Sequence, residues 1–97
     1  MPTPLSVLTA SQIETALDHL PGWTFADNAL HRTLKFADFR QATGFIVRLS
    51  FEAEQRNHHP DLRNVYSTVE ISLSTHDAGN QVTRLDVDLA QAINSLL

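Results

Sequence analysis

The sequence predicts a single α+β domain over residues 1–97, in which helices pack on one face of an antiparallel sheet. Three stretches carry apolar residues at helical spacing. Each begins with a Thr or Asp followed three residues later by Gln or Asp, the pattern of a capping box. Between these stretches, apolar and polar residues alternate with the two-residue period of a half-buried strand. The predicted order is therefore helix, two strands, helix, one or two strands, helix.

The first helix is expected to begin at Thr9, because Gln12 stands at the partner position of a capping box. The dipeptide Pro21-Gly22 should end this helical segment, since proline cannot continue a helix and glycine favours its end. Residues 1–7 are expected to be a loose lead-in.

A hairpin of two strands is expected next. The stretches 23–25 and 30–36 both alternate apolar with polar residues, and Asp27-Asn28 between them is a turn signal. The two strands should therefore share one apolar face.

A long second helix is expected to follow, with Asp38 as its N-cap and Gln41 at the capping-box position. Pro60 should end it, because proline disfavours the α conformation in the preceding residue, His59. The pair His58-His59 is therefore expected where the helix runs out and the chain turns. The residues expected to form the buried stripe are Phe39, Ala42, Ile46, Leu49 and Ala53.

The last third of the chain predicts strand and then helix. A short strand is expected at 64–66, and residues 69–76 alternate clearly. A tight Ser67-Thr68 turn would separate two strands, although one long strand also fits the alternation. Thr83 then begins the last helix, with Asp86 at the capping-box position.

Composition excludes several classes of function. The net charge of −4, with seven scattered Lys and Arg residues, argues against a nucleic-acid partner. The chain has no cysteine, hence neither disulfides nor thiolate metal sites. No apolar run approaches the ~20 residues of a membrane helix, and residues 1–6 lack the features of a signal peptide. The expected location is the cytoplasm.

The residues best suited to chemistry are His58, His59 and His76, which are expected to converge from a helix end and a strand end. Glu54 lies four residues before His58, so the two side chains could meet on one helix face. Two chemistries fit this group. Three neutral imidazoles could bind a metal with Glu54 or Asp86, or the histidines could act as general acids and bases near neutral pH.

Simpler interpretations apply to the other candidates. His19 falls in the last turn of the first helix and His31 on the polar face of its strand, so both are interpreted as surface residues. The capping box alone would explain Asp86, and Glu54 could be a solvated helix residue.

The spaced motif resembles a known family. Its elements are Glu54, His58-His59-Pro60, Tyr66, His76 and Asp86. This set, with matching segments around it over roughly residues 8–97, is similar to the signature of pterin-4a-carbinolamine dehydratases.

The resemblance implies a four-stranded antiparallel sheet with helices on one face, assembled into homodimers or homotetramers. It implies loss of water from 4a-hydroxytetrahydropterin to give quinonoid dihydropterin, a step that regenerates the cofactor of aromatic amino acid hydroxylases. No metal and no organic cofactor is implied.

The resemblance also implies roles for individual residues. His58 and His76 would transfer protons, in an order that the sequence leaves open, and His59 would hold the pterin. Glu54 and Asp86 would support the site. Further contacts to the pterin would come from Pro60, Ser74, Thr75 and Asp77.

One position departs from the family pattern, since Leu62 stands where many members have tryptophan. This puts an aromatic wall for the pterin in doubt. A non-catalytic role as an assembly factor or dimerisation cofactor is the alternative function, and a metal-binding protein using His58, His59 and His76 is a third. Intact histidines favour the dehydratase.

Overall fold

The computed structural model describes residues 5–97, so most of the segment 1–6 and part of the expected lead-in 1–7 lie outside the described residues. The strands form one antiparallel sheet in the order β1-β2-β4-β3. The predicted α+β class with a four-stranded antiparallel sheet is thereby confirmed. The elements are α1 (Ala10–Leu17), β1 (Thr24–Ala26), β2 (Ala29–Lys35), α2 (Phe39–Arg56), β3 (Asp61–Val65), β4 (Thr68–Leu73), the short 3-10 turn η1 (His76–Ala78) and α3 (Arg84–Ser95).

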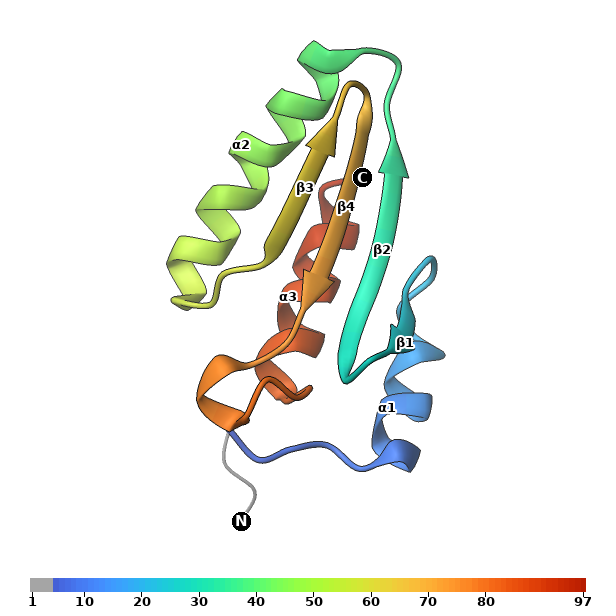
Figure 1. Cartoon of the computed structure of the whole chain (residues 1–97), viewed down its shortest axis with the longest axis vertical. Coiled ribbons are helices and arrows are strands. Elements are labelled where there is room, and N and C mark those ends of the chain that lie inside the picture. The colour runs from blue at the N-terminus through green and yellow to red at the C-terminus, as the bar shows by residue number, and fades with distance from the viewer. Residues whose placement is uncertain (1–4) are drawn as a thin grey trace.

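The sheet has one core face and one open face. In Figure 1 the strands lie in front of α3, which covers the core face. Strands β2 and β4 contribute alternate residues to that face, where they pack with buried residues of α2 and α3 and with the partly buried Leu62 of β3. Burying each large apolar side chain contributes ~1.5–3 kcal/mol. The buried sheet residues are Leu30, Leu34, Val69, Ile71 and Leu73.

All three predicted N-caps are present. The backbone N–H of Gln12 donates to Thr9 Oγ1 at 3.1 Å, and that of Thr9 donates to Gln12 Oε1 at 2.8 Å. Asp38 Oδ1 accepts from the backbone N–H of Gln41 at 2.8 Å. Thr83 caps α3 through a complete capping box. Each such cap contributes about 1 kcal/mol, and the third also fixes a residue of the candidate site.

The two hairpins turn tightly, but the second does so one residue earlier than expected. Asp27 and Asn28 adopt φ angles of 51° and 61°, as a two-residue hairpin turn requires. The second turn consists of Tyr66 and Ser67, because Val65 pairs directly with Thr68. The expected strand 64–66 is wrong in its bounds, since the polar residues that open β3 obscured its alternation.

Helix α2 ends at Arg56, not at Pro60 as expected. Asn57 adopts the left-handed conformation with φ 49° and ψ 42°. The backbone N–H groups of Asn57 and His58 then donate to the carbonyls of Glu54 and Ala53, both at 3.1 Å. This is the Schellman arrangement of a helix C-terminus, and it takes His58 off the helix axis.

The buried stripe of α2 differs from the expected one at its first turn. Ala42, Leu49 and Ala53 are buried as predicted, but Phe39 is 60% exposed, and this part of the prediction is wrong. The core at this end is closed by Phe36, whose ring packs on the buried Phe45 with centroids 5.2 Å apart. Because Phe36 precedes the helix, helical periodicity could not identify it.

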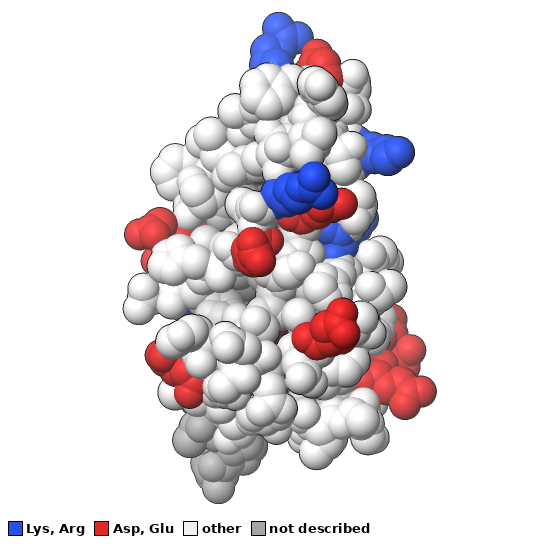
Figure 2. Space-filling view, in the orientation of Figure 1, with Lys and Arg blue, Asp and Glu red and all other residues white. Residues whose placement is uncertain are grey.

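The face shown in Figure 2 has no patch of clustered basic residues. Its Lys and Arg side chains are scattered, mostly over the upper half. Among residues 5–97, no helix has the length and apolar character needed to span a membrane.

The left-handed Asn57 gives a prediction about stability. Replacing Asn57 with alanine should cost about 1 kcal/mol of unfolding free energy, because a Cβ without a compensating polar group disfavours this conformation. Asn57→Gly should stay within about 0.5 kcal/mol of the wild type. Urea denaturation of both variants measures the difference, and an alanine variant as stable as the glycine variant would contradict this account of the helix end.

Candidate active site

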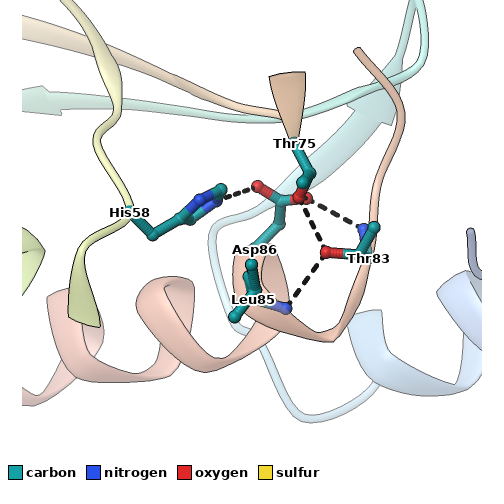
Figure 3. A network of polar contacts seen from close by, with 5 residues as sticks. All are labelled: His58, Thr75, Thr83, Leu85 and Asp86. Atoms are coloured by element: carbon teal, nitrogen blue, oxygen red, sulfur yellow. Dashed lines mark hydrogen bonds and ion pairs between the residues drawn. The ribbon is translucent and has the colours of Figure 1, made fainter. Parts of the chain in front are cut away.

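A buried pair joins the helix end to the last helix. His58 Nε2 lies 2.6 Å from Asp86 Oδ1, and the Asp86 side chain is fully buried. Figure 3 shows the imidazole directed at this carboxylate, with the side chains of Thr75 and Thr83 on the carboxylate's other side. A carboxylate can only accept hydrogen bonds from an imidazole, so Nε2 carries the proton. In the neutral form of the ring, Nδ1 is then a proton acceptor.

The second oxygen of Asp86 belongs to a directed chain of hydrogen bonds. Thr75 Oγ1 donates to Asp86 Oδ2 at 2.8 Å, so the hydroxyl of Thr83 must donate to Thr75 Oγ1 at 2.7 Å. Thr83 Oγ1 in turn accepts from the backbone N–H of Leu85 at 3.2 Å. The hydroxyl protons of Thr75 and Thr83 therefore each have one possible acceptor.

The same carboxylate caps α3. Asp86 Oδ2 also accepts from the backbone N–H of Thr83 at 2.9 Å, which is the reciprocal bond of the capping box. Asp86 thus accepts three hydrogen bonds from protein groups. The sequence suggested either a cap or a supporting role for Asp86, and the two oxygens of one carboxylate allow both.

Glu54 contacts His59, and the expected contact between Glu54 and His58 is wrong. Glu54 Oε1 lies 2.7 Å from His59 Nε2. Because α2 ends at Arg56, His58 turns towards the core, and the next residue reaches back to Glu54. The side chains of His59 and Glu54 are 57% and 77% exposed, so this pair orients a ring at the surface and adds little stability.

His76 lies in η1, beyond the end of β4. Its side chain is 91% exposed, and Nδ1 lies 3.3 Å from Asp77 Oδ1. The strand ends at Leu73, and Thr75 then forms an isolated bridge with Gln81. The side chain of His76 is therefore free to meet a molecule bound at the surface.

Two clefts meet at these histidines. We call them the His58 cleft, of about 250 Å³, and the His31 cleft, of about 460 Å³. Both are lined by His59, Ser74 and His76. The His58 cleft is completed by Leu5, Asn57, His58, Thr75, Asp77 and Leu85. The His31 cleft is completed by Ala29, His31, Pro60, Asp61, Ser72 and Asn80.

The structure thus brings most of the predicted site residues together. The predicted residues that line at least one cleft are His58, His59, Pro60, Ser74, Thr75, His76 and Asp77. Glu54 and Asp86 line neither and act through His59 and His58. Leu62 lies against the hydrophobic core, so the side chain at this position does not line either cleft.

Sequence reasoning missed His31, which was interpreted as a surface residue. It is half-buried, and both ring nitrogens are engaged: Nδ1 with Ser72 Oγ and Nε2 with the Ala26 carbonyl, each at 2.9 Å. The alternation of β2 placed His31 on the polar face. The cross-strand partner was not visible because it depends on the pairing register.

The histidines do not form a metal centre by themselves in this structure. Within residues 5–97, no group of three or more His, Cys, Asp or Glu side chains lies close enough to hold a metal ion. His58 and His59 point to different partners, since one contacts Asp86 and the other Glu54. Their arrangement suits proton transfer and hydrogen bonding.

Comparison with known proteins points in one direction. The family model described as pterin 4 alpha carbinolamine dehydratase matches residues 6–96. Two bacterial relatives carry a pterin-4-alpha-carbinolamine dehydratase name as a provisional assignment. The one from Opitutus terrae is 46% identical and covers 99% of this chain and 96% of its own. The one from Rhodopseudomonas palustris is 50% identical and covers 92% and 89%.

Solved structures agree with the fold. A structure described as a transcriptional coactivator/pterin dehydratase from Brucella melitensis is 39% identical, with a TM-score of 0.89 over 94% of this chain and 98% of that one. Another, described as a pterin dehydratase-like protein that is a RuBisCO assembly factor in the alpha-carboxysome, is 19% identical. Its TM-score is 0.61 over 76% and 84% of the two chains, and this likeness concerns the fold alone.

The hydroxyl of Thr75 is predicted to contribute measurably to stability. Thr75→Val keeps the shape but deprives Asp86 and Thr83 of a buried partner, so it should cost ~1–3 kcal/mol more than Thr75→Ser, which keeps the hydroxyl. Chemical denaturation of the two variants gives the difference. Equal stabilities would show that the network does not depend on this hydroxyl.

Proposed function

This chain belongs to the pterin 4 alpha carbinolamine dehydratase family, and from that premise we propose that it removes water from 4a-hydroxytetrahydropterin to give quinonoid dihydropterin. The observation that carries the proposal is the imidazole of His58, which lines the His58 cleft and whose Nε2 is held by the buried Asp86. This arrangement leaves Nδ1 of His58 to exchange a proton with a bound molecule.

The reaction needs two proton movements. The C4a–O bond breaks, its oxygen gains a proton, N5 loses a proton, and the electron pair of the N–H bond forms the new double bond between N5 and C4a. In this proposal, Nδ1 of His58 takes the N5 proton, and Asp86 stabilises the imidazolium that forms. His76, in contact with solvent, gives its proton to the departing oxygen. General acid and base catalysis each contribute typically ~10²–10⁴-fold.

The remaining residues bind and orient the substrate in this scheme. His59 faces both clefts and is oriented by Glu54, so it holds the pterin between them. The backbone around Ser74, Thr75 and Asp77 supplies further hydrogen-bonding groups beside His76. The scheme requires no metal and no organic cofactor. It also includes a cytoplasmic location and a supply of substrate from aromatic amino acid hydroxylases.

Kinetics of variants test this assignment. His58→Ala and His76→Ala should each lower turnover by ~10²-fold or more, because each removes a proton-transfer group. His59→Ala should mainly raise KM. The double variant of His58 and His76 should lose less than the product of the single losses, since the two groups act in one step. Stopped-flow measurement of 4a-hydroxytetrahydropterin decay, with and without protein, gives these values.

A matched control comes from His19, which is exposed and lines neither cleft. His19→Ala should leave both kcat and KM unchanged. Wild-type turnover in all three site variants would overturn the assignment. Well-folded wild-type protein that does not accelerate the decay would overturn the proposed function itself and favour the non-catalytic, protein-binding alternative.

We further propose that the chain self-associates through α2. Three large apolar residues, Phe39, Val47 and Phe51, are exposed on this helix. If two copies of α2 run antiparallel about a two-fold axis at Val47, Arg40 of one lies opposite Glu54 of the other, seven residues on either side. A self-complementary charge pattern around an apolar strip is what a two-fold interface requires.

This surface gives a prediction about the molar mass of the protein in solution. Val47→Glu would place two carboxylates together at the two-fold axis, so it should shift the wild-type assembly towards monomer. Tyr66→Glu, at the exposed turn between β3 and β4 and outside α2 itself, should leave the mass of the assembly unchanged. Light scattering coupled to size-exclusion chromatography reads out both. An assembly that survives Val47→Glu would place the interface elsewhere.

A further inference from the structure

The His31 cleft contains a second set of polar groups that the proposed reaction does not use. We propose that His31 and Ser72 determine substrate specificity by binding the hydroxylated substituent at C6 of the pterin. This inference rests on the proposed function. It assigns a role to the part of the site that lies on the open face of the sheet.

The hydrogen bonds of His31 fix what this part of the cleft presents. The carbonyl of Ala26 can only accept, so His31 Nε2 carries the proton. In the neutral ring Nδ1 is then an acceptor, and it takes the hydroxyl proton of Ser72 at 2.9 Å. Ser72 Oγ consequently faces the cleft with its lone pairs. It is a fixed acceptor for a donor on a ligand.

The sheet register extends this acceptor surface. Ser72 pairs with His31 on one side and with Asp61 on the other. The three side chains therefore form a row across β2, β4 and β3 on the open face. Asp61 adds carboxylate oxygens, which also accept. Such a row suits a group that donates several hydrogen bonds, as a chain of hydroxyl groups does.

The position of the row relative to the histidines identifies the part of the substrate that reaches it. In the proposed reaction N5 lies at His58 and the departing oxygen at His76, and His76 is one of the residues that line both clefts. C6 is bonded to N5, so the substituent at C6 extends from the ring directly beside the reacting atoms. Asp61 is two residues beyond His59, and Ser72 is two residues before Ser74, so the row lies at most ~7 Å further along the chain from these two residues.

The chemical character of the two clefts favours this orientation. The His58 cleft includes the apolar side chains of Leu5 and Leu85, which suit the flat faces of a ring. The His31 cleft is lined mainly by polar side chains, with Asn80 beside the row. With the ring in the former, the C6 substituent enters the latter.

The test compares two substrates, 4a-hydroxytetrahydropterins with a dihydroxypropyl or a methyl group at C6. Ser72→Ala should raise KM roughly 3- to 10-fold for the dihydroxypropyl substrate, the worth of about one neutral hydrogen bond. It should leave kcat unchanged, and it should leave both constants unchanged for the methyl substrate. His31→Phe should act in the same direction, because it frees the Ser72 hydroxyl to rotate.

Two controls separate a binding role from a structural one. Ser72→Thr keeps the hydroxyl and should have the wild-type KM. Thr33→Ala, on an exposed part of β2, should leave KM and kcat unchanged for both substrates. Equilibrium binding of the corresponding 7,8-dihydropterins should show the same selectivity without turnover. Equal effects of Ser72→Ala on both substrates, or none, would overturn the inference while the dehydratase remained. A wild-type protein inactive with both would overturn the proposed function and this inference with it.

Discussion

The buried carboxylate of Asp86 is the group on which the candidate site depends. Removing a carboxylate from water is costly unless hydrogen bonds replace its solvent, and here three protein donors do so. Those donors come from the turn after α2, the segment after β4 and the start of α3. One side chain thereby ties three segments together, and the orientation of His58 is a consequence of how α3 begins. The same carboxylate therefore caps a helix and orients an imidazole in this fold.

Much of the fold could be predicted because its signals are local. Capping residues stand three positions apart, and apolar residues repeat with periods of about 3.6 or 2. Thr83 and Asp86 were therefore identifiable as a cap from the sequence. The family signature also contains Asp86, which the resemblance predicted to support a site. Neither signal showed that the carboxylate of Asp86 both caps α3 and holds His58. These two residues are 28 positions apart, and their contact depends on tertiary packing.

The features that escaped prediction depend on backbone conformation or register. The end of α2 was placed at Pro60, because proline is the stronger signal, yet Asn57 ends the helix by adopting a left-handed conformation that asparagine tolerates. This earlier end of the helix decides that Glu54 meets His59 instead of His58. Likewise, the alternation of β2 put His31 on a polar face, but only the pairing register puts it opposite Ser72. A shift of one residue would have sent its side chain to the core.

The two-residue period of β4 explains why the site has two sides. Leu73 and Thr75 point towards the core, where Thr75 holds Asp86 and hence His58. Ser72 and Ser74 point to the open face, where they line the His31 cleft. Leu73 and Thr75 are thus buried, whereas Ser72 and Ser74 are half-buried beside the cleft, although the four residues are consecutive along the chain. Because the two sets face opposite sides of the sheet, a substitution on the open face can leave the hydrogen bonds that hold His58 unchanged.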